Sequence, residues 1–292
     1  MSGGPMTEHA DKLMDGRSLA RRVLADAARK VAHIRERTGV TPALATVIVG
    51  DDPASHTYVR MKRRRCEDAG MRSVRVELGA GVSTETLVEQ IARLGADETV
   101  HGILVQHPVP APIDRRAAFE AIPVAKDVDG VTSATLGRVL LGMPAFEPCT
   151  PRGIIMLLDD HRVELDGAHA IVIGRSPILG RPMASMLINR HATVTLCHSR
   201  TRNLPALVRE AEVVIAAVGR PRFVQGEWIK PGAVVVDAGY NEGTIGDVDF
   251  DAALSRCSLI TPVPGGVGPM TIATLIDQTA NAAAAQLGVS FD

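Results

Sequence analysis

The stretch from Ile171 to Pro182 constrains the fold more than any other, because it reads as a strand, a glycine turn and a helix in succession. The apolar run ends at Gly174, a second glycine follows at Gly180, and apolar residues then recur at helical spacing. Glycines at such a turn let the backbone approach a pyrophosphate, and the helix N-terminus offers unpaired N–H groups to it. Ser176 stands where the G-x-G-x-x-G pattern has its second glycine, so the turn alone fits either a dinucleotide site or a plain strand-to-helix connection.

Strand and helix patterns alternate along most of the chain. The expected strands are 43–49, 73–78, 102–106, 169–173, 193–196, 212–218, 233–237 and 258–261. The expected helices start at Ser18, cover 54–69, follow Ser83, start at Thr150 as N-cap, follow Gly180, and cover 204–210 and 271–284. This order predicts an α/β protein with parallel sheets, whose ligands sit at the carboxyl ends of the strands. A new α/β series begins at Thr150, which predicts one domain over 1–148 and a Rossmann-like domain over 149–270.

Composition narrows the class of partner. A formal net charge of −1 gives no reason to expect nucleic acid or a membrane. The N-terminal segment 1–11 is polar, and charged residues occur in it before any apolar run develops. We therefore expect it to be a disordered extension rather than a signal peptide. The four cysteines lie far apart, which is typical of a cytoplasmic protein with neither a zinc site nor a disulfide framework.

Tyr58 and Lys62 are four residues apart on the expected helix 54–69, so their side chains share one face near a strand end. A lysine crowded by positive charge and burial has a lowered pKa and can transfer protons near neutral pH. The structural alternative is a packed tyrosine beside one of several solvated cations. A short-chain dehydrogenase also carries Tyr-x-x-x-Lys, but there the dyad follows the glycine turn, whereas here it precedes Gly174 by more than 100 residues.

Polar residues also follow the strand 102–106 and a later loop. Gln106 ends its strand before a proline-rich loop, where it could act in the site or bond to the backbone. Asp127 and Asp129 could be a metal pair, but no histidine or further carboxylate accompanies them, so an Asx turn is favoured and no metal is expected.

The end of the strand 193–196 favours NADP over NAD. An NAD site usually has an acidic residue here to bind the ribose 2′-hydroxyl. This chain has Cys197-His-Ser-Arg-Thr201 instead, with Arg175 in the glycine turn. A hydroxyl and a cation at this place suit a 2′-phosphate, although a solvated surface turn would look the same.

Together these segments resemble the bifunctional methylenetetrahydrofolate dehydrogenase/methenyltetrahydrofolate cyclohydrolase family. The resemblance runs from about Leu13 to Ala284. It is carried by 49–55 with Tyr58 and Lys62, 102–106, 126–130, 148–153, 172–176, 193–201, 246–248 and the Pro/Gly-rich segment 261–271.

The resemblance implies a homodimer that acts in one-carbon metabolism and supports purine biosynthesis. It would oxidise 5,10-methylenetetrahydrofolate with NADP and hydrolyse the methenyl product to 10-formyltetrahydrofolate. The two domains would flank a cleft, with the C-terminal helix (about 271–292) returning to the first domain. The implied site residues fall into three groups. The catalytic group is Lys62, Tyr58, Gln106 and Asp129; the NADP group is Gly174, Arg175, Ser176, Ser199 and Arg200; the folate group is Tyr58, Ser55, Asp129, Pro264, Gly265 and Gly266.

The chain departs from the family pattern at three positions. His107 follows Gln106 where leucine is usual, and Thr135 and Gln278 stand where asparagine is common. None of these changes removes a catalytic group, but His107 bears on folate affinity and on the balance of the two activities. Two alternatives stay open at this point: an NADP oxidoreductase with a non-folate substrate, and a dinucleotide-binding sensor without turnover.

Overall fold

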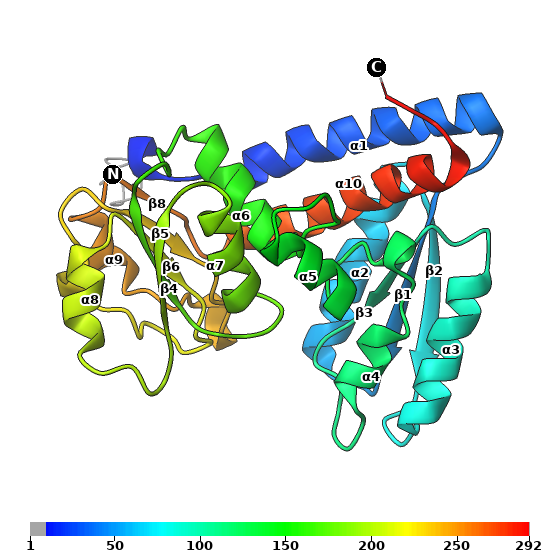
Figure 1. The fold of residues 1–292 in the computed structure, drawn as a ribbon, viewed down its shortest axis with the longest axis horizontal. Helices are drawn as coiled ribbons and strands as arrows, with labels where there is room; N and C mark the ends of the chain where they lie inside the picture. Colours follow the sequence, from blue (N-terminus) through cyan, green and yellow to red (C-terminus); the bar gives the residue numbers. More distant parts are fainter. Residues whose placement is uncertain (1–9, 292) are drawn as a thin grey trace, which may run out of the picture. The chain divides into compact units, whose positions relative to one another are not determined.

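The computed structural model describes residues 10–291, and the chain divides into two compact units (Figure 1). The three-stranded unit contains residues 21–138, 144–149 and those from Ile272 on. The five-stranded unit contains the residues up to Ala20, 139–143 and Thr150–Thr271. Most of the extension expected over 1–11 lies outside the described residues, but its last part, from Ala10, belongs to a 3-10 helix that reaches Lys12.

The three-stranded unit is built on a parallel sheet in the order β2-β1-β3. Its strands are β1 (Ala43–Val49), β2 (Arg72–Leu78) and β3 (Gly102–Val105). Its helices are α2 (Pro53–Asp68), α3 (Thr84–Ala96), α4 (Arg115–Glu120), α5 (Ser133–Leu140, whose last two residues lie in the other unit) and most of α1 (Gly16–Thr38) and α10 (Val267–Leu287). The central strand β1 is buried along its whole length, as the absence of polar alternation predicted.

Helices α1 and α10 run side by side and share one core with the sheet (Figure 1). Ala27 and Val31 of α1 pack in one apolar cluster with Leu275 and Ile276 of α10, and with Leu44 of β1. Burial of a valine, leucine or isoleucine side chain such as those in this cluster is worth about 1.5–3 kcal/mol. The last helix is therefore part of the core of this unit.

The five-stranded unit contains a parallel sheet in the order β5-β4-β6-β7-β8. Its strands are β4 (His169–Ile173), β5 (Thr193–Cys197), β6 (Val213–Ala216), β7 (Val234–Asp237) and β8 (Leu259–Ile260). Its helices are α6 (Cys149–Asp160, which begins one residue inside the other unit), α7 (Gly180–Ile188), α8 (Leu204–Glu210) and α9 (Phe250–Leu254). From β4 the chain continues to β5 on one side of β4, and from β5 it crosses to β6 on the other side. The topological switch point therefore lies between β4 and β6.

Three expected helix starts are wrong. Ser18 does not start its helix, because α1 already begins at Gly16 and Ser18 lies in its first turn. Thr150 is not an N-cap, because α6 already begins at Cys149 and the Thr150 hydroxyl faces that of Thr271 at 3.1 Å. Helix α10 begins at Val267, inside the segment that its prolines and glycines marked as a loop. Pro269 fits there because the first turn of a helix needs no backbone N–H partner.

Candidate active site

The candidate site of the three-stranded unit starts from the N-terminus of α2, directly after β1. Asp52 caps this helix, and its carboxylate accepts hydrogen bonds from the backbone N–H and the hydroxyl of Ser55 at 2.7 and 2.6 Å. The same Ser55 hydroxyl lies 3.3 Å from the carbonyl oxygen of His107. Ser55, expected to bind folate, is thus buried and engaged in fixing the helix start beside the loop that follows β3.

Lys62 lies one turn beyond Tyr58 on α2, and both side chains are partly buried. The Lys62 ammonium donates a hydrogen bond of 2.9 Å to Oε1 of Gln106, at the end of β3. The Gln106 amide nitrogen donates in turn to the carbonyl oxygen of His107 at 2.7 Å. Two residues predicted from separate segments are therefore in direct contact.

Burial lowers the pKa of Lys62, and the negative charge of Asp129 opposes this effect. The neighbouring arginines that suggested the same direction from sequence are exposed on α2 and are not among the causes. Burial also raises the pKa of Asp129 to about 6, although the Lys62 charge and a hydrogen bond with Cys149 act against it. The site thus places a base and an acid that both titrate closer to neutrality than their free counterparts.

The members of the Lys126–Gly130 motif have separate tasks. The Lys126 ammonium donates to the carbonyl oxygens of Gly95 and Asp97, each at 2.8 Å, and so fixes the C-terminal end of α3. The buried Asp127 carboxylate accepts the N–H groups of Val131 and Thr132 at 3.0 and 2.9 Å. These partners are four and five residues ahead, so Asp127 stabilises a longer loop than an Asx turn. Asp129 is the member whose charge acts on Lys62.

Gln278 and Cys149 support this loop, and neither was predicted as a site residue. The Gln278 amide on α10 donates to the carbonyl oxygens of Val128 and Glu147 at 2.8 and 2.9 Å. The Cys149 thiol donates to the Val128 carbonyl at 3.2 Å, and burial raises its pKa well above the ordinary value. A polar residue in an alanine-rich helix was the available signal for Gln278.

His107 has no hydrogen-bond partner for either ring nitrogen within the described part of the chain, although both nitrogens are buried. Its ring meets that of Phe119 edge to face, with centroids 4.9 Å apart. Burial lowers the pKa of His107 to about 4, and the charges of Lys62 and Arg115 act in the same direction. The imidazole is therefore neutral at physiological pH.

The glycine turn of the five-stranded unit lies at the carboxyl ends of β4, β5 and β6. The N–H of Gly174 donates to the Cys197 carbonyl at 2.9 Å, and the N–H of Ala217 donates to the Ile173 carbonyl at 2.8 Å. A Cβ on Gly174 would lie 2.1 Å from the Ala217 oxygen, and one on Gly180 would lie 1.9 Å from the Gly174 oxygen. The turn therefore depends on both glycines, as a close-packed dinucleotide turn does.

The residues around this turn fit a dinucleotide. The N-cap of α7, Leu179, makes no side-chain hydrogen bond to the first turn, and the N–H of Arg181 in that turn donates to the Ser176 carbonyl oxygen at 3.1 Å. Arg175, Ser199 and Arg200 are exposed at the ends of β4 and β5, with no acidic side chain in the 197–201 segment. Pro264, Gly265 and Gly266 belong to this unit too, in the connection from β8 to α10, where Arg17 lies 3.5 Å from the Pro264 oxygen.

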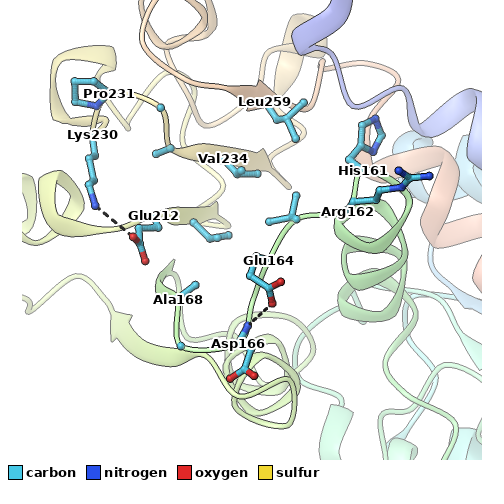
Figure 2. Close-up of a pocket in the computed structure, with 15 residues that line it drawn as sticks. His161, Arg162, Glu164, Asp166, Ala168, Glu212, Lys230, Pro231, Val234 and Leu259 are labelled. Carbon is cyan, nitrogen blue, oxygen red and sulfur yellow. Dashed lines mark hydrogen bonds and ion pairs between the residues drawn. The ribbon is translucent and has the colours of Figure 1, made fainter.

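A cavity of about 630 Å³ lies at the opposite, amino-terminal ends of the strands of this sheet (Figure 2). Ala168, Val213, Val234 and Leu259 line it at or just before the strand starts, and a Glu212–Lys230 ion pair of 3.6 Å stands at its side. None of the site residues predicted from sequence lines this cavity. Across residues 10–291, no group of three His, Cys, Asp or Glu side chains could hold a metal ion. No helix in the same range combines the length and apolar character that crossing a bilayer requires.

Comparison with known proteins assigns both halves of the chain. Residues 14–129 match the model described as tetrahydrofolate dehydrogenase/cyclohydrolase, catalytic domain, and residues 148–287 match the model for the NAD(P)-binding domain of the same family.

Relatives match over nearly the full length. The bifunctional protein FolD 1 of Streptomyces avermitilis is 60% identical over 278 residues, which are 95% of this chain and 97% of that protein. The crystal structure of the Campylobacter jejuni bifunctional enzyme FolD, a methylenetetrahydrofolate dehydrogenase/cyclohydrolase, has a TM-score of 0.91 at 41% identity, covering 94% of this chain and 98% of that one. The Trypanosoma brucei enzyme, solved with NADP cofactor and an inhibitor, has a TM-score of 0.90 at 38% identity, covering 94% and 97%.

Proposed function

This chain belongs to the tetrahydrofolate dehydrogenase/cyclohydrolase family and is a bifunctional enzyme of one-carbon metabolism, and on that premise we propose which residues carry its two reactions. The enzyme oxidises methylenetetrahydrofolate and hydrolyses the methenyl product. This membership removes the two alternatives left open by the sequence, the non-folate oxidoreductase and the sensor without turnover.

The observation that supports our assignment is the 2.9 Å hydrogen bond from Lys62 to Gln106, together with the lowered pKa of Lys62. In the cyclohydrolase step, water adds to the cationic methenyl carbon and must lose a proton. Lys62 in its free-amine form accepts that proton, and it returns a proton to the folate nitrogen when the carbon–nitrogen bond breaks. Gln106 holds the amine in place during both transfers.

In the dehydrogenase step, the bound nicotinamide accepts the hydride from the methylene carbon. The chain then has to align two rings, and we assign Tyr58 to packing against the folate and Asp129 to binding its pterin. An Asp129 carboxyl with a pKa of about 6 is mostly ionised at neutral pH, so it can accept hydrogen bonds from the pterin N–H groups. Pro264, Gly265 and Gly266 complete the proposed folate group.

We assign NADP as the preferred cofactor, held by Gly174, Arg175, Ser176, Ser199 and Arg200. The support is the exposed cation and hydroxyl at the ends of β4 and β5, where an NAD site usually has a carboxylate.

We also assign a homodimer formed through the five-stranded unit, working in the cytoplasm. Strand β5 is an edge of its sheet, and its Leu196 is 37% exposed, which leaves an open strand that a second copy can cover. The four buried cysteines are all free thiols, as a reducing compartment maintains them. Sedimentation of the wild type and of Leu196→Lys tests the dimer: a monomeric wild type would contradict it.

The direct test of the function is a spectrophotometric assay with methylenetetrahydrofolate, run with NADP and with NAD. We expect methenyl absorbance to rise with NADP and then decay by hydrolysis, and turnover with NAD to be weaker. Methenyltetrahydrofolate supplied without cofactor should be hydrolysed as fast as methenyltetrahydrofolate supplied together with NADP. This measurement separates the second reaction from the first. Cofactor binding without turnover would contradict the assigned residues.

A further inference from the structure

The Asp247 carboxylate, between β7 and α9, binds three successive backbone N–H groups of the loop that follows β6. Its Oδ2 accepts from Val218 at 2.6 Å and from Gly219 at 2.8 Å, and its Oδ1 accepts from Arg220 at 2.9 Å. The amide of Asn241 adds a fourth bond to Oδ1 at 3.0 Å. Asp247 is fully buried, so these bonds replace its whole hydration shell.

A second buried carboxylate, that of Asp237, binds the backbone N–H of Asp247. Asp237 ends β7 and accepts the N–H groups of Gly239, Asp247 and Val248, each at 2.9 Å. Burial raises the pKa of Asp237 to about 6, and the charge of Asp247 adds to this effect. Two buried carboxylates that lie close together destabilise each other's charged form.

Two glycines lie directly against the pair, where no side chain would fit. A Cβ on Gly239 would lie 2.3 Å from Cγ of Asp247, and one on Gly246 would lie 2.0 Å from Oδ2 of Asp237. The two glycines therefore let backbone enclose both carboxylates. The Asp247 oxygens are held by the four hydrogen bonds that they accept within this close-packed surrounding.

The loop that Asp247 holds is one wall of the switch point between β4 and β6. Ala217, just before Val218, lies against Gly174 so closely that no side chain fits between them. Parallel sheets bind their ligands at this place. Because the three N–H groups already bind Asp247, they are not available to a cofactor phosphate, which leaves the phosphates to the Gly174–Gly180 turn.

We infer that Asp247, backed by Asp237, is a positioning residue for the dinucleotide: it fixes the loop after β6 against the glycine turn and so sets the shape of the cofactor site. This inference rests on the NADP-dependent dehydrogenase function. Within residues 10–291, no hydrogen bond of Asp247 reaches Lys62 or a residue of the proposed folate group, so we expect its effect to be confined to the reaction that uses the cofactor.

The bifunctional enzyme supplies its own control, because the cyclohydrolase step needs no dinucleotide. In Asp247→Asn the side chain keeps one acceptor oxygen for the N–H donors of the loop. Its second oxygen is replaced by an NH2 group, which cannot accept a hydrogen bond. We expect the KM for NADP to rise about tenfold or more. The KM for methylenetetrahydrofolate and the cyclohydrolase rate on supplied methenyltetrahydrofolate should stay at wild-type values. The matched control is Asp249→Asn, an N-cap carboxylate of α9 that makes no side-chain cap hydrogen bond; it should change neither reaction.

An unchanged KM for NADP in Asp247→Asn would overturn the inference, and so would an equal loss of both reactions in a folded variant. If Asp247→Asn does not fold, Asn241→Ala decides, since it removes one bond to Oδ1 and leaves the three backbone donors of Asp247 in place. The same amide also donates to the Ile245 carbonyl oxygen at 3.0 Å, which keeps its bond from the Asn241 backbone N–H. Asn241→Ala should raise the KM for NADP about twofold to threefold, and an unchanged value there also overturns the inference. Failure of the proposed function would look different, because the wild type itself would then show no NADP-dependent turnover.

Discussion

Nζ of Lys62 donates a hydrogen bond of 2.9 Å to Oε1 of Gln106, 44 positions away in the sequence. The Gln106 amide can point only one way here, because its nitrogen donates to the His107 carbonyl at the other end. The hydrogen bond thus joins helix α2 to the residue that follows β3, in a region where burial lowers the pKa of the lysine. The first two predictions follow from this contact.

Replacing the amine should abolish the hydrolytic step. Lys62→Met keeps the length and apolar stem of the side chain but removes the proton acceptor. We expect the cyclohydrolase rate to fall by about 10²–10⁴, measured as the decay of methenyl absorbance. Arg63→Met, an exposed cation on the same helix, is the control and should retain full activity. Full hydrolysis by Lys62→Met would contradict the role of this residue.

A charge at Gln106 should move the pH profile. In Gln106→Glu a carboxylate stands beside the lysine, which raises the pKa of Lys62 and so lowers the fraction of free amine at neutral pH. The acid limb of the cyclohydrolase pH–rate profile should shift upward by about one pH unit or more. Gln90→Glu on α3 adds the same charge elsewhere and should leave the profile in place. A profile identical to that of the wild type would show that Gln106 does not tune the lysine.

Arg175 should discriminate between the two cofactors. Arg175→Ala removes a cation that we assign to the 2′-phosphate, which NAD lacks. The KM for NADP should rise about tenfold and that for NAD should barely change, as expected for one charged hydrogen-bonding partner. Equal losses for both cofactors would place the 2′-phosphate elsewhere.

His107 should make the three-stranded unit sensitive to acid. Its folded pKa of about 4 lies below the unfolded value of 6.5, so the unfolded chain binds more protons between these two pH values. The stability that His107 contributes is present above pH 6.5 and is lost as the pH falls toward 4. In His107→Leu the free energy of unfolding should therefore drop less between pH 7 and pH 4, by about 3 kcal/mol. Denaturant titrations of both proteins at the two pH values measure the difference, and parallel losses would contradict it.

The sequence predicted the sheets better than the helix boundaries. Strand β1 and helix α8 have the predicted bounds, because a run without polar alternation and a Pro-marked helix start are local signals. The short helices α4, α5 and α9 were not predicted, since segments of five to eight residues carry little periodicity. The start of α10 was placed too late, because glycine and proline mark a loop and a helix N-terminus alike.

For the site, the sequence predicted which side chains of one helix lie on the same face. It did not predict the contacts that distant parts of the chain make with the site. Tyr58 and Lys62 share a helix face by spacing alone. That Gln278 would reach the Val128 carbonyl, 150 positions away, depends on the packing of α10 against the sheet. The same holds for Asp247, which the Gly246–Val248 motif marked without indicating its partners.

The place of α10 in the core has a consequence for synthesis on the ribosome. All five strands of the second sheet have been made once Ile260 has left the ribosome, so that unit can fold early. The first sheet is made earlier, yet its core waits for Leu275 and Ile276, and the Asp129 loop waits for Gln278. The unit whose sheet is made first is therefore completed last, and a nascent chain released before α10 would expose the apolar surface of β1 and β3.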